Sequence, residues 1–277
     1  MTNSSAESPV ERVEDVDYPP SIPCPPPSPT LAVALLPQLA GDVSNSICIV
    51  IDALRATTVI ATLFEKGCPR VYVAGSHVIA KTFARERGYT LCGETDGFVA
   101  SGFDYGNSPT EFSRLDFTEK PVVLSTSNGT KAIAMVSGAK RIYLGSALNR
   151  MAVSEAAWRE ALQIGANLMI VCSGTLGEFT LEDATVAGGY VEALYGQAGA
   201  WELPIVKDSA IACRRLWQSE SNLLRGIMEG NHAHALADRG FGEDIGFCSM
   251  VDTLSHVPTL VSEAETETVP CPVILLT

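Results

Sequence analysis

The chain has 277 residues, of which 46% are hydrophobic, and its formal net charge is −13. This length and apolar content allow one large α/β domain or two small ones that share a core, and they exclude a mini-protein that needs covalent staples. The acidic balance argues against binding to nucleic acid or to an anionic membrane, because both require a basic protein face.

Residues 1–30 show no hydrophobic periodicity. They hold eight of the 16 prolines together with several acidic residues, so we predict a disordered extension. A polyproline ligand for a partner domain is the weaker alternative, because no basic residue flanks the prolines. The chain has neither a signal-peptide pattern nor an apolar run of transmembrane length, and its eight scattered cysteines form no C-x-x-C pair. These features predict free thiols in a cytoplasmic protein.

From residue 31 onward, short β-rich runs alternate with segments of helical period, which is typical of α/β layering. We predict a layered α/β/α fold with a mixed or mostly parallel sheet and a helix-rich C-terminal part. This region covers residues 31–262, with two subdomains divided near 145–175 as an option, and a C-terminal tail follows at 263–277. The predicted strands are Leu31–Leu35, Ile47–Ile51, Arg70–Val73, Tyr89–Cys92, Val122–Leu124, Arg141–Leu144 and Leu168–Val171. The predicted helices are Thr57–Lys66, His77–Arg87, Thr130–Val136, Asn149–Ile164, Leu181–Tyr195, Lys207–Gln218, Ser221–Met228 and Asn231–Arg239.

The stretch from Asp52 to Thr58 follows the apolar run Ile47–Ile51 and precedes a predicted helix. A carboxylate, a guanidinium and two hydroxyls therefore lie where a buried strand ends. Ligands bind at that edge of open α/β sheets, since helix N-termini and strand-end loops converge there. A carboxylate can hold Mg²⁺, an arginine can clamp an oxyanion, and hydroxyls can bind phosphate, so the stretch predicts an enzyme with an anionic substrate. The structural alternative is a turn in which Asp52 and Arg55 pair with each other.

Polar clusters also follow three other predicted strands, at Glu94, at Ser125–Thr130 and at Cys172–Thr175. If the strands are parallel neighbours, these loops share one rim with Asp52. The Ser125–Thr130 loop combines small hydroxyl residues with Asn-Gly and precedes a helix, which is suited to cradling an anion. An ordinary turn in which Thr126 or Ser127 caps the helix explains the loop equally well.

Three further groups have strong structural explanations. Thr180 and Asp183 are spaced as a capping box, although Glu182 or Asp183 could instead supply a metal ligand or a general base. Asn107 could reach a ligand, but Ser108 and Pro109 beside it are suited to starting a helix. His232 and His234 are two residues apart and would face different directions on a helix, so they make a poor metal pair.

These motifs together resemble those of the 2-phosphosulfolactate phosphatase family. The resemblance is carried over roughly residues 45–262 by Ile51–Thr58, Gly93-Glu94, Gly102–Pro109, Thr126–Thr130, Leu181–Asp183 with Ala187-Gly188, Gly242–Ile245, Val251-Asp252 and Val257-Pro258. Each motif is loose, and the series in this order is fairly specific. The chain departs from the pattern after Glu94, where the family has an arginine and this sequence has Thr95-Asp96.

The resemblance implies a Mg²⁺-dependent acid phosphatase that hydrolyses (2R)-phospho-3-sulfolactate to 3-sulfolactate and phosphate, a step of coenzyme M biosynthesis in some organisms. The expected partner is this small phosphorylated anion, without nucleic acid or membrane, and a homo-oligomer is compatible with the sequence. The departure at Thr95 motivates one alternative, a phosphatase for another small phosphorylated hydroxy acid. A non-catalytic anion-binding relative is the other.

We assign three sets of candidate residues on this basis. The catalytic set is Asp52, Arg55, Glu182 and Asp183. The set for substrate and phosphate is Thr57, Thr58, Asn107, Ser127, Asn128, Gly129 and Thr130. The metal ligands are Asp52, Glu94 and Asp183, and the sequence leaves open whether Asp52 holds the metal or takes a proton.

Overall fold

The computed structural model describes residues 29–197, 205–261 and 273–276. Residues 1–28 of the predicted extension lie outside the described residues, as does most of the predicted tail. Within the described part, the fold is α/β with two sheets, and the predicted fold class is confirmed. The division into two sheets was not predicted, because strand pairing depends on contacts between distant residues.

Sheet A is parallel throughout. Its strands follow the order β7 (Arg141–Gly145), β2 (Ser46–Ile51), β8 (Asn167–Cys172), β1 (Thr30–Ala34) and β9 (Ile205–Val206). Every residue of β2 is buried, as expected for a central parallel strand with covered faces. Its side chains alternate, so that Ile47, Ile49 and Ile51 enter one core while Cys48 and Val50 enter another. The carboxyl ends of β2 and β8 lie side by side, with Ile51 opposite Cys172.

Sheet B is mixed. Its strands follow the order β10 (Leu260–Val261), β11 (Val273–Leu276), β3 (Val71–Ala74), β6 (Val122–Ser125), β4 (Thr90–Thr95) and β5 (Phe98–Val99). The three central strands β3, β6 and β4 run parallel, and the outer ones pair antiparallel. The tight β4–β5 turn is made by Asp96 and Gly97, both with positive φ. β11 belongs to the predicted tail, where we expected no strand.

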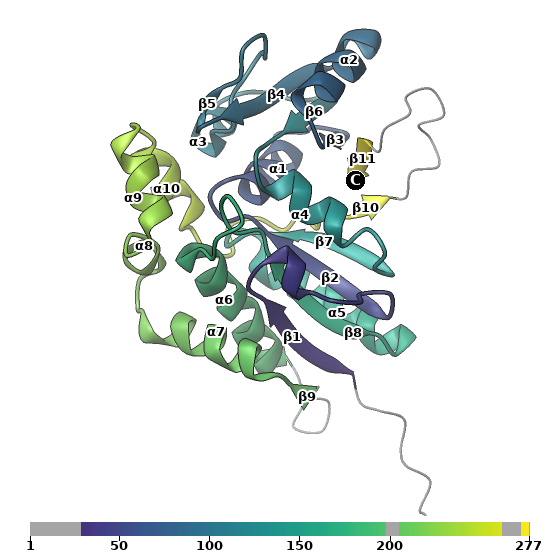
Figure 1. Ribbon diagram of the computed structural model, residues 1–277, viewed down its shortest axis with the longest axis vertical. Coiled ribbons are helices and arrows are strands. Elements are labelled where there is room, and N and C mark those ends of the chain that lie inside the picture. The colour runs from purple at the N-terminus through teal and green to yellow at the C-terminus, as the bar shows by residue number, and fades with distance from the viewer. Residues whose placement is uncertain (1–28, 198–204, 262–272, 277) are drawn as a thin grey trace, which may run out of the picture.

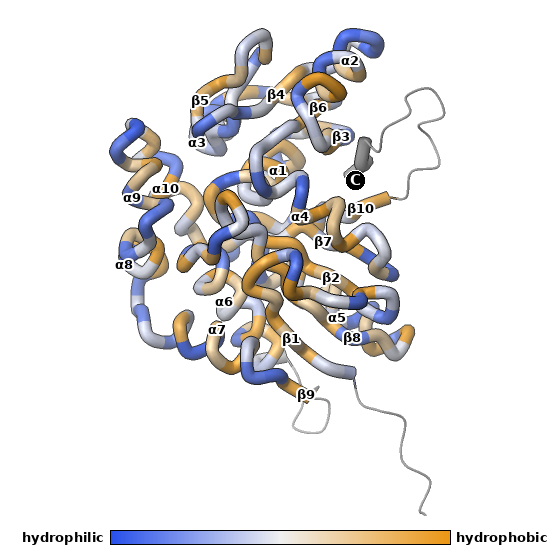
Figure 2. The backbone as a smooth tube through the Cα atoms, viewed as in Figure 1, coloured by the Kyte–Doolittle hydropathy of each residue, from blue (hydrophilic) through white to orange (hydrophobic). Residues whose placement is uncertain are grey.

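The helices form layers around the sheets (Figure 1). They are α1 (Ala56–Glu65), α2 (His77–Arg87), α3 (Pro109–Ser113), α4 (Gly129–Met135), α5 (Arg150–Ile164), α6 (Leu181–Gln197), α7 (Asp208–Ser219), α8 (Leu223–Ile227), α9 (Asn231–Asp238) and α10 (Gly242–Cys248), with a 3-10 helix η1 at Pro37–Leu39. Helices α5, α6 and α7 pack against one face of sheet A. Helices α1 and α4 share a core with its other face and with sheet B, so one apolar interior joins both sheets. Helix α2 covers sheet B, and the orange strands of Figure 2 mark the apolar layers.

The seven predicted strands and eight predicted helices are all present; α2 has the predicted bounds, and the others have shifted ends. The elements that the sequence did not predict are short: β5, β9, β10, β11, η1, α3 and α10. The boundary between the two sheets does not fall near residues 145–175, because β7 and β8, on either side of that region, both belong to sheet A. The strands of sheet B lie in the chain between β2 and β7 or after residue 259. Sheet B is thus largely an insertion between two neighbouring strands of sheet A.

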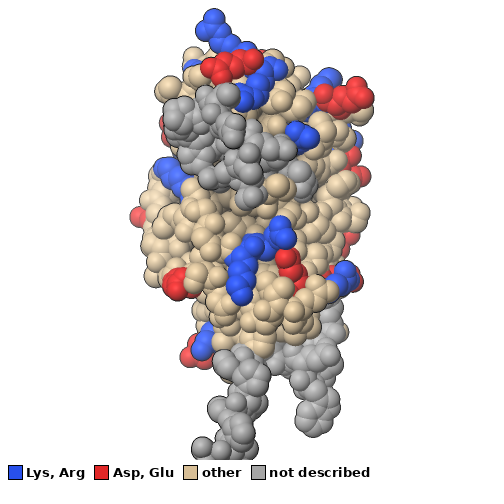
Figure 3. Space-filling view, turned by 90° about the vertical axis from the view of Figure 1, so that its right-hand side faces the viewer, with Lys and Arg blue, Asp and Glu red and all other residues tan. Residues whose placement is uncertain are grey.

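The state of the cysteines and the distribution of surface charge can be compared with what the composition predicts. Six cysteines of the described residues are free and buried: Cys48, Cys68, Cys92, Cys172, Cys213 and Cys248. In the part of the chain that the structure describes, no helix has the length and apolar character needed to cross a membrane. On the face shown in Figure 3, Lys and Arg side chains are interspersed with Asp and Glu side chains and form no continuous basic patch.

Candidate active site

A pocket of about 100 Å³ lies where the ends of both sheets meet helix α9. The expected single rim is wrong, because β2 and β8 belong to sheet A, whereas β4 and β6 belong to sheet B. The loops after these strands nevertheless line one pocket together. The predicted site residues that line the pocket are Asp52, Arg55, Glu94, Asn107, Ser127 and Asn128. Five other lining residues belong to the loops that the sequence placed at the site without a role of their own: Leu54, Asp96, Gly97, Thr126 and Thr175. The sequence did not mark the remaining four: Leu176, His232, Leu236 and Arg239.

Asp52 lies at the centre of the site and is held by its own turn. Its Oδ1 accepts a hydrogen bond from the Ala56 N–H at 3.1 Å, while its N–H donates to Thr57 Oγ1 at 3.0 Å. The hydroxyl of Thr57 donates back to the Asp52 carbonyl, and that of Thr58 donates to the Ala53 carbonyl. Both threonine side chains therefore hold the turn, and neither lines the pocket. Burial and the negative charge of nearby Glu94 raise the pKa of Asp52 to about 6.

Arg55 pairs with a residue that lies far along the chain. Its Nη1 lies 2.6 Å from Asp244 Oδ2, its Nη2 donates to the Gly97 carbonyl at 2.8 Å, and its guanidinium stacks on the Phe241 ring. The predicted structural pair between Asp52 and Arg55 is therefore wrong, because the partner is Asp244. The peptide bond between Leu54 and Arg55 is cis. The guanidinium borders the pocket with its charge already balanced by a buried carboxylate.

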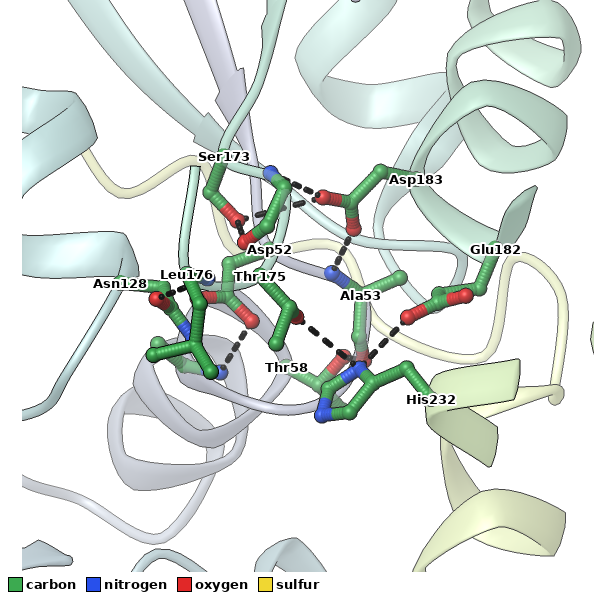
Figure 4. A network of polar contacts seen from close by, with 12 residues as sticks. Asp52, Ala53, Thr58, Asn128, Ser173, Thr175, Leu176, Glu182, Asp183 and His232 are labelled. Atoms are coloured by element: carbon green, nitrogen blue, oxygen red, sulfur yellow. Dashed lines mark hydrogen bonds and ion pairs between the residues drawn. The ribbon is translucent and has the colours of Figure 1, made fainter. Parts of the chain in front are cut away.

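Asp183 connects the two strand ends of sheet A (Figure 4). Its Oδ1 accepts from the Ala53 N–H at 2.8 Å, and its Oδ2 accepts from the Gly174 N–H at 2.9 Å and from the Ser173 hydroxyl. The alternative of a capping box is wrong, because the carboxylate bonds across the sheet end and Thr180 Oγ1 has no hydrogen-bond partner among the described residues. Burial, together with the charges of Asp52 and Glu182, raises the pKa of Asp183 to about 7.

His232 lines the pocket, and the sequence did not mark it as a site residue. Its Nδ1 lies 2.7 Å from Glu182 Oε1 and 3.3 Å from Thr175 Oγ1, and its other ring nitrogen points away from Glu182 (Figure 4). Burial alone would lower the pKa of His232, but the hydrogen bond to Glu182 and the charges of Glu182, Asp52 and Asp183 raise it above the usual value. In the sequence, the spacing between His232 and His234 indicated only a poor metal pair. No local pattern shows that α9, which carries His232, packs near the end of β2.

The Glu94 carboxylate holds the two loops of sheet B together. Its Oε1 accepts from the Ser127 N–H and its Oε2 from the Gly97 N–H, both at 2.9 Å. Asn128 is the N-cap residue of α4, but its side chain makes no cap bond and its Oδ1 accepts from the Leu176 N–H. The alternative that Thr126 or Ser127 caps the helix is therefore wrong. Thr95, at the departure from the family pattern, lies 3.1 Å from His77 Nε2.

Two buried polar atoms beside the pocket have no hydrogen-bond partner within the described ranges: Asn107 Oδ1 and Thr126 Oγ1. Ser108 caps α3 as expected, accepting from the Glu111 N–H, and Asn107 is left beside the pocket. Buried polar groups in proteins are normally paired, and an unpaired one costs free energy. The two orphaned atoms therefore point to a ligand that completes their hydrogen bonds.

Gly129 and Thr130 support the site from behind the pocket. The Thr130 hydroxyl donates to the Thr126 carbonyl at 2.9 Å. A Cβ added to Gly129 would lie 2.7 Å from Asp52 Oδ2 and 2.7 Å from Ala56 Cβ, which no real side chain tolerates without a shift. Neither residue lines the pocket, and Gly129 is required for the close approach of α4 to Asp52.

Gly129→Ala is therefore expected to displace Asp52 and to lower the activity of the site. We expect kcat/KM to fall by about 10²-fold, since small displacements in an active site have effects of this size. The overpacking should also cost about 1–3 kcal/mol of stability. Gly138→Ala is the matched control, because a Cβ added to this exposed glycine after α4 meets nothing within 4 Å. Equal activity of the two variants would contradict the role given to Gly129.

A divalent metal fits this site in part. Asp52 and Glu94 line the pocket, Asp183 lies behind it, and Glu182 Oε2 is buried without a hydrogen-bond partner in the described structure. In the described residues, no three His, Cys, Asp or Glu side chains are gathered closely enough to form a complete metal-binding group. Mg²⁺ does not require such a group, because it is usually bound by one or two carboxylates, with waters and substrate phosphate completing its shell. The hard oxygen donors and the excess of buried negative charge fit Mg²⁺ bound in that manner.

Comparison with known proteins places these residues in a family. A family model described as 2-phosphosulpholactate phosphatase matches residues 34–263. A protein of Pseudothermotoga lettingae named "Probable 2-phosphosulfolactate phosphatase" is 35% identical over 233 residues, which are 83% of this chain and 96% of that protein. Proteins with the same name from Symbiobacterium thermophilum and Thermotoga petrophila are 32% and 34% identical, covering 79% and 77% of this chain and 93% and 88% of theirs.

Proposed function

Because the chain belongs to the 2-phosphosulfolactate phosphatase family, we propose that it hydrolyses (2R)-phospho-3-sulfolactate to 3-sulfolactate and phosphate with the help of Mg²⁺. This is the reaction of coenzyme M biosynthesis that the motifs imply. The observation that carries the proposal is the pocket in which buried carboxylates, a paired histidine and two orphaned polar atoms face one another. The oxygens of a phosphate ester would accept from the Thr126 hydroxyl, and a hydroxyl of the ligand or a water bound with it would donate to Asn107 Oδ1.

Asp52, with Asp183 or Glu94, would hold the metal. When bound, Mg²⁺ neutralises negative charge on the phosphoryl oxygens. The Thr126 hydroxyl can donate to one of these oxygens, and the Asn107 amide can orient the same group. The turn bonds of Thr57 and Thr58 and the contact of Gly129 fix the Asp52 carboxylate, so its position is set before the substrate arrives.

His232 is placed to protonate the leaving oxygen. Water forms a new P–O bond, the ester P–O bond breaks, and Nε2 of His232 gives its proton to the departing oxygen. The proton that the water loses goes to whichever of the two buried carboxylates, Asp52 or Asp183, does not hold the metal. Glu182 accepts from Nδ1, which fixes the ring orientation and favours the protonated form. Nε2 is free for this role, since it has no hydrogen-bond partner in the described residues.

His232→Gln is expected to lower kcat for an alkyl phosphate by about 10²- to 10⁴-fold, the usual contribution of a general acid. The loss should be much smaller for 4-nitrophenyl phosphate, because its leaving group needs no proton. The measurement is kcat for both esters with the wild type and the variant. His234→Gln is the control, on the same helix and exposed. An equal loss for the two esters would remove the acid role from His232.

The function itself is tested by phosphate release from 2-phosphosulfolactate with Mg²⁺ or with EDTA. We expect turnover with Mg²⁺ and its loss with EDTA. Phosphate release that is unchanged by EDTA would remove the metal from the proposal. Absence of turnover for any phosphate ester, together with ligand binding in a calorimeter, would favour a non-catalytic anion-binding protein.

One observation favours a second substrate. Asp96 lines the pocket at the position where the chain departs from the family pattern, and it adds negative charge near the ligand. This charge would favour a phosphorylated hydroxy acid that carries fewer negative groups than phosphosulfolactate. A panel of such acids compared by kcat/KM separates the two, and a clear preference for phosphosulfolactate would exclude this second candidate.

A further inference from the structure

The pocket has three basic side chains, Arg55, His232 and Arg239, and two of them are already paired with carboxylates. Arg55 forms its ion pair with Asp244 at 2.6 Å, and both side chains are buried. His232 pairs with Glu182 at 2.7 Å. A ligand anion at either group competes with a protein carboxylate that is fixed in place.

Arg239 differs from both. It is exposed at the C-cap of α9, and no hydrogen bond or ion pair joins it to another side chain in the described parts of the chain. Two carboxylates are near Arg239: Asp96 lines the same pocket, and Asp238 precedes Arg239 in the chain. Neither forms an ion pair with Arg239 in the described part of the structure. In the described part of the chain, no carboxylate forms an ion pair with the Arg239 guanidinium, so its positive charge is not balanced by a protein group.

The position of Arg239 is defined by the β4–β5 turn. A Cβ built on Gly97 would lie 3.8 Å from Arg239 Cδ, so the arginine stem passes directly beside this turn. The same turn binds Glu94 and Arg55 through the N–H and the carbonyl of Gly97. Phe241, two residues beyond Arg239, packs on Phe98 of β5 and holds this corner against the hairpin. The guanidinium is therefore at the mouth of the pocket, on the β4–β5 side.

We propose that Arg239 binds the second anionic group of the substrate, a carboxylate or a sulfonate, and so selects esters that carry an acid group besides phosphate. The inference rests on the proposed function and names a specificity residue for it. A planar guanidinium can donate two parallel hydrogen bonds to a carboxylate or sulfonate, which an ammonium cannot do with the same geometry. Arg239 takes no part in bond breaking, so its contribution is to binding.

The decisive experiment measures binding without turnover. Calorimetry with 3-sulfolactate, which has both acid groups and no phosphate, is compared with inorganic phosphate for the wild type, Arg239→Ala and Arg239→Lys. We expect Arg239→Ala to raise the Kd of 3-sulfolactate by about 10- to 100-fold more than it raises the Kd of phosphate. This is the usual size of the loss when a hydrogen bond to a charged group is removed. Arg239→Lys should recover part of the loss. Arg215→Ala, an exposed arginine of α7, is the matched control.

Kinetics provide a second reading. The ratio of kcat/KM for 2-phosphosulfolactate to that for isopropyl phosphate should fall by about the same factor in Arg239→Ala, through KM rather than kcat. The inference would be overturned if Arg239→Ala affected 3-sulfolactate and phosphate equally, if it affected the two esters equally, or if it affected none of these ligands. It would also be overturned if the wild type did not bind 3-sulfolactate. A wild type that binds 3-sulfolactate through Arg239 but releases no phosphate would instead overturn the proposed function alone.

Discussion

Asp52→Asn is expected to lower kcat/KM by about 10³-fold or more, because the amide can neither hold Mg²⁺ as a charged ligand nor take a proton. Charge stabilisation by a metal is worth several kcal/mol, and each 1.36 kcal/mol is about a factor of ten in rate. The turn should survive, since the Asn side-chain oxygen can still accept from the Ala56 N–H. The measurement is phosphate release with saturating Mg²⁺, with circular dichroism to verify the fold.

The same variant should be more stable than the wild type in EDTA at pH 8. Folding raises the pKa of Asp52 from 3.8 to about 6, so the folded protein binds the proton more tightly than the unfolded chain. The wild type therefore loses stability as the pH rises from about 4 through 6, and the whole loss is present at pH 8. Asn carries no charge and avoids this loss. Asp42→Asn is the control, since Asp42 is exposed and accepts from Ser44. Full Mg²⁺-dependent activity of Asp52→Asn would mean that Asp52 has neither role.

Asp244→Ala is expected to destabilise the fold by about 3–5 kcal/mol, because it leaves the buried Arg55 guanidinium without its counter-charge. The variant also leaves the Ser108 hydroxyl and the Thr110 N–H without their acceptor. For a protein of this size the loss corresponds to a fall in Tm of about 6–20 °C. Urea denaturation followed by circular dichroism measures the free energy of unfolding directly.

Helix α10 provides the matched control for this prediction. Glu243 is next to Asp244, and its ion pair with Arg114 is exposed, so Glu243→Ala should change stability by about 0–1 kcal/mol. The double variant Arg55→Met with Asp244→Leu should recover much of the loss, because no unpaired charge remains. If Asp244→Ala and Glu243→Ala were equally stable, the buried pair would not have the importance given to it here.

Local patterns in the sequence predicted the longer strands and helices and six of the fifteen residues that line the pocket. The apolar run before Asp52 and the polar residues after Val122–Leu124 mark strand ends, and strand ends are where ligand-binding loops collect. Asp52, Glu94 and Asn128 were found in this way, and all three line the pocket. The continuous apolar run Ile47–Ile51 also predicted a buried strand, and β2 is buried along its whole length.

The remainder depends on contacts that no local pattern records. His232 and Arg239 belong to a short amphipathic helix whose sequence contains nothing typical of a site, and only the packing of α9 beside the β4–β5 turn brings them to Asp52. The pairing of Arg55 with Asp244 joins residues in separate motifs. The two sheets could not be predicted either, because neighbouring strand-like runs give no signal of which strands pair.

The insertion of sheet B between β2 and β7 has a consequence for synthesis on the ribosome. Domains begin to fold from the N-terminal side as the chain emerges, at about 5–20 residues per second. β2 must wait for β7 and β8 before it has neighbours on either side, and such distant pairings form slowly. Asp52 then meets His232 and Arg239 only after the C-terminal helices have emerged. A nascent chain that stops before α9 carries the carboxylates and Arg55 without His232 and Arg239, so the pocket is complete only when nearly the whole polypeptide has been made.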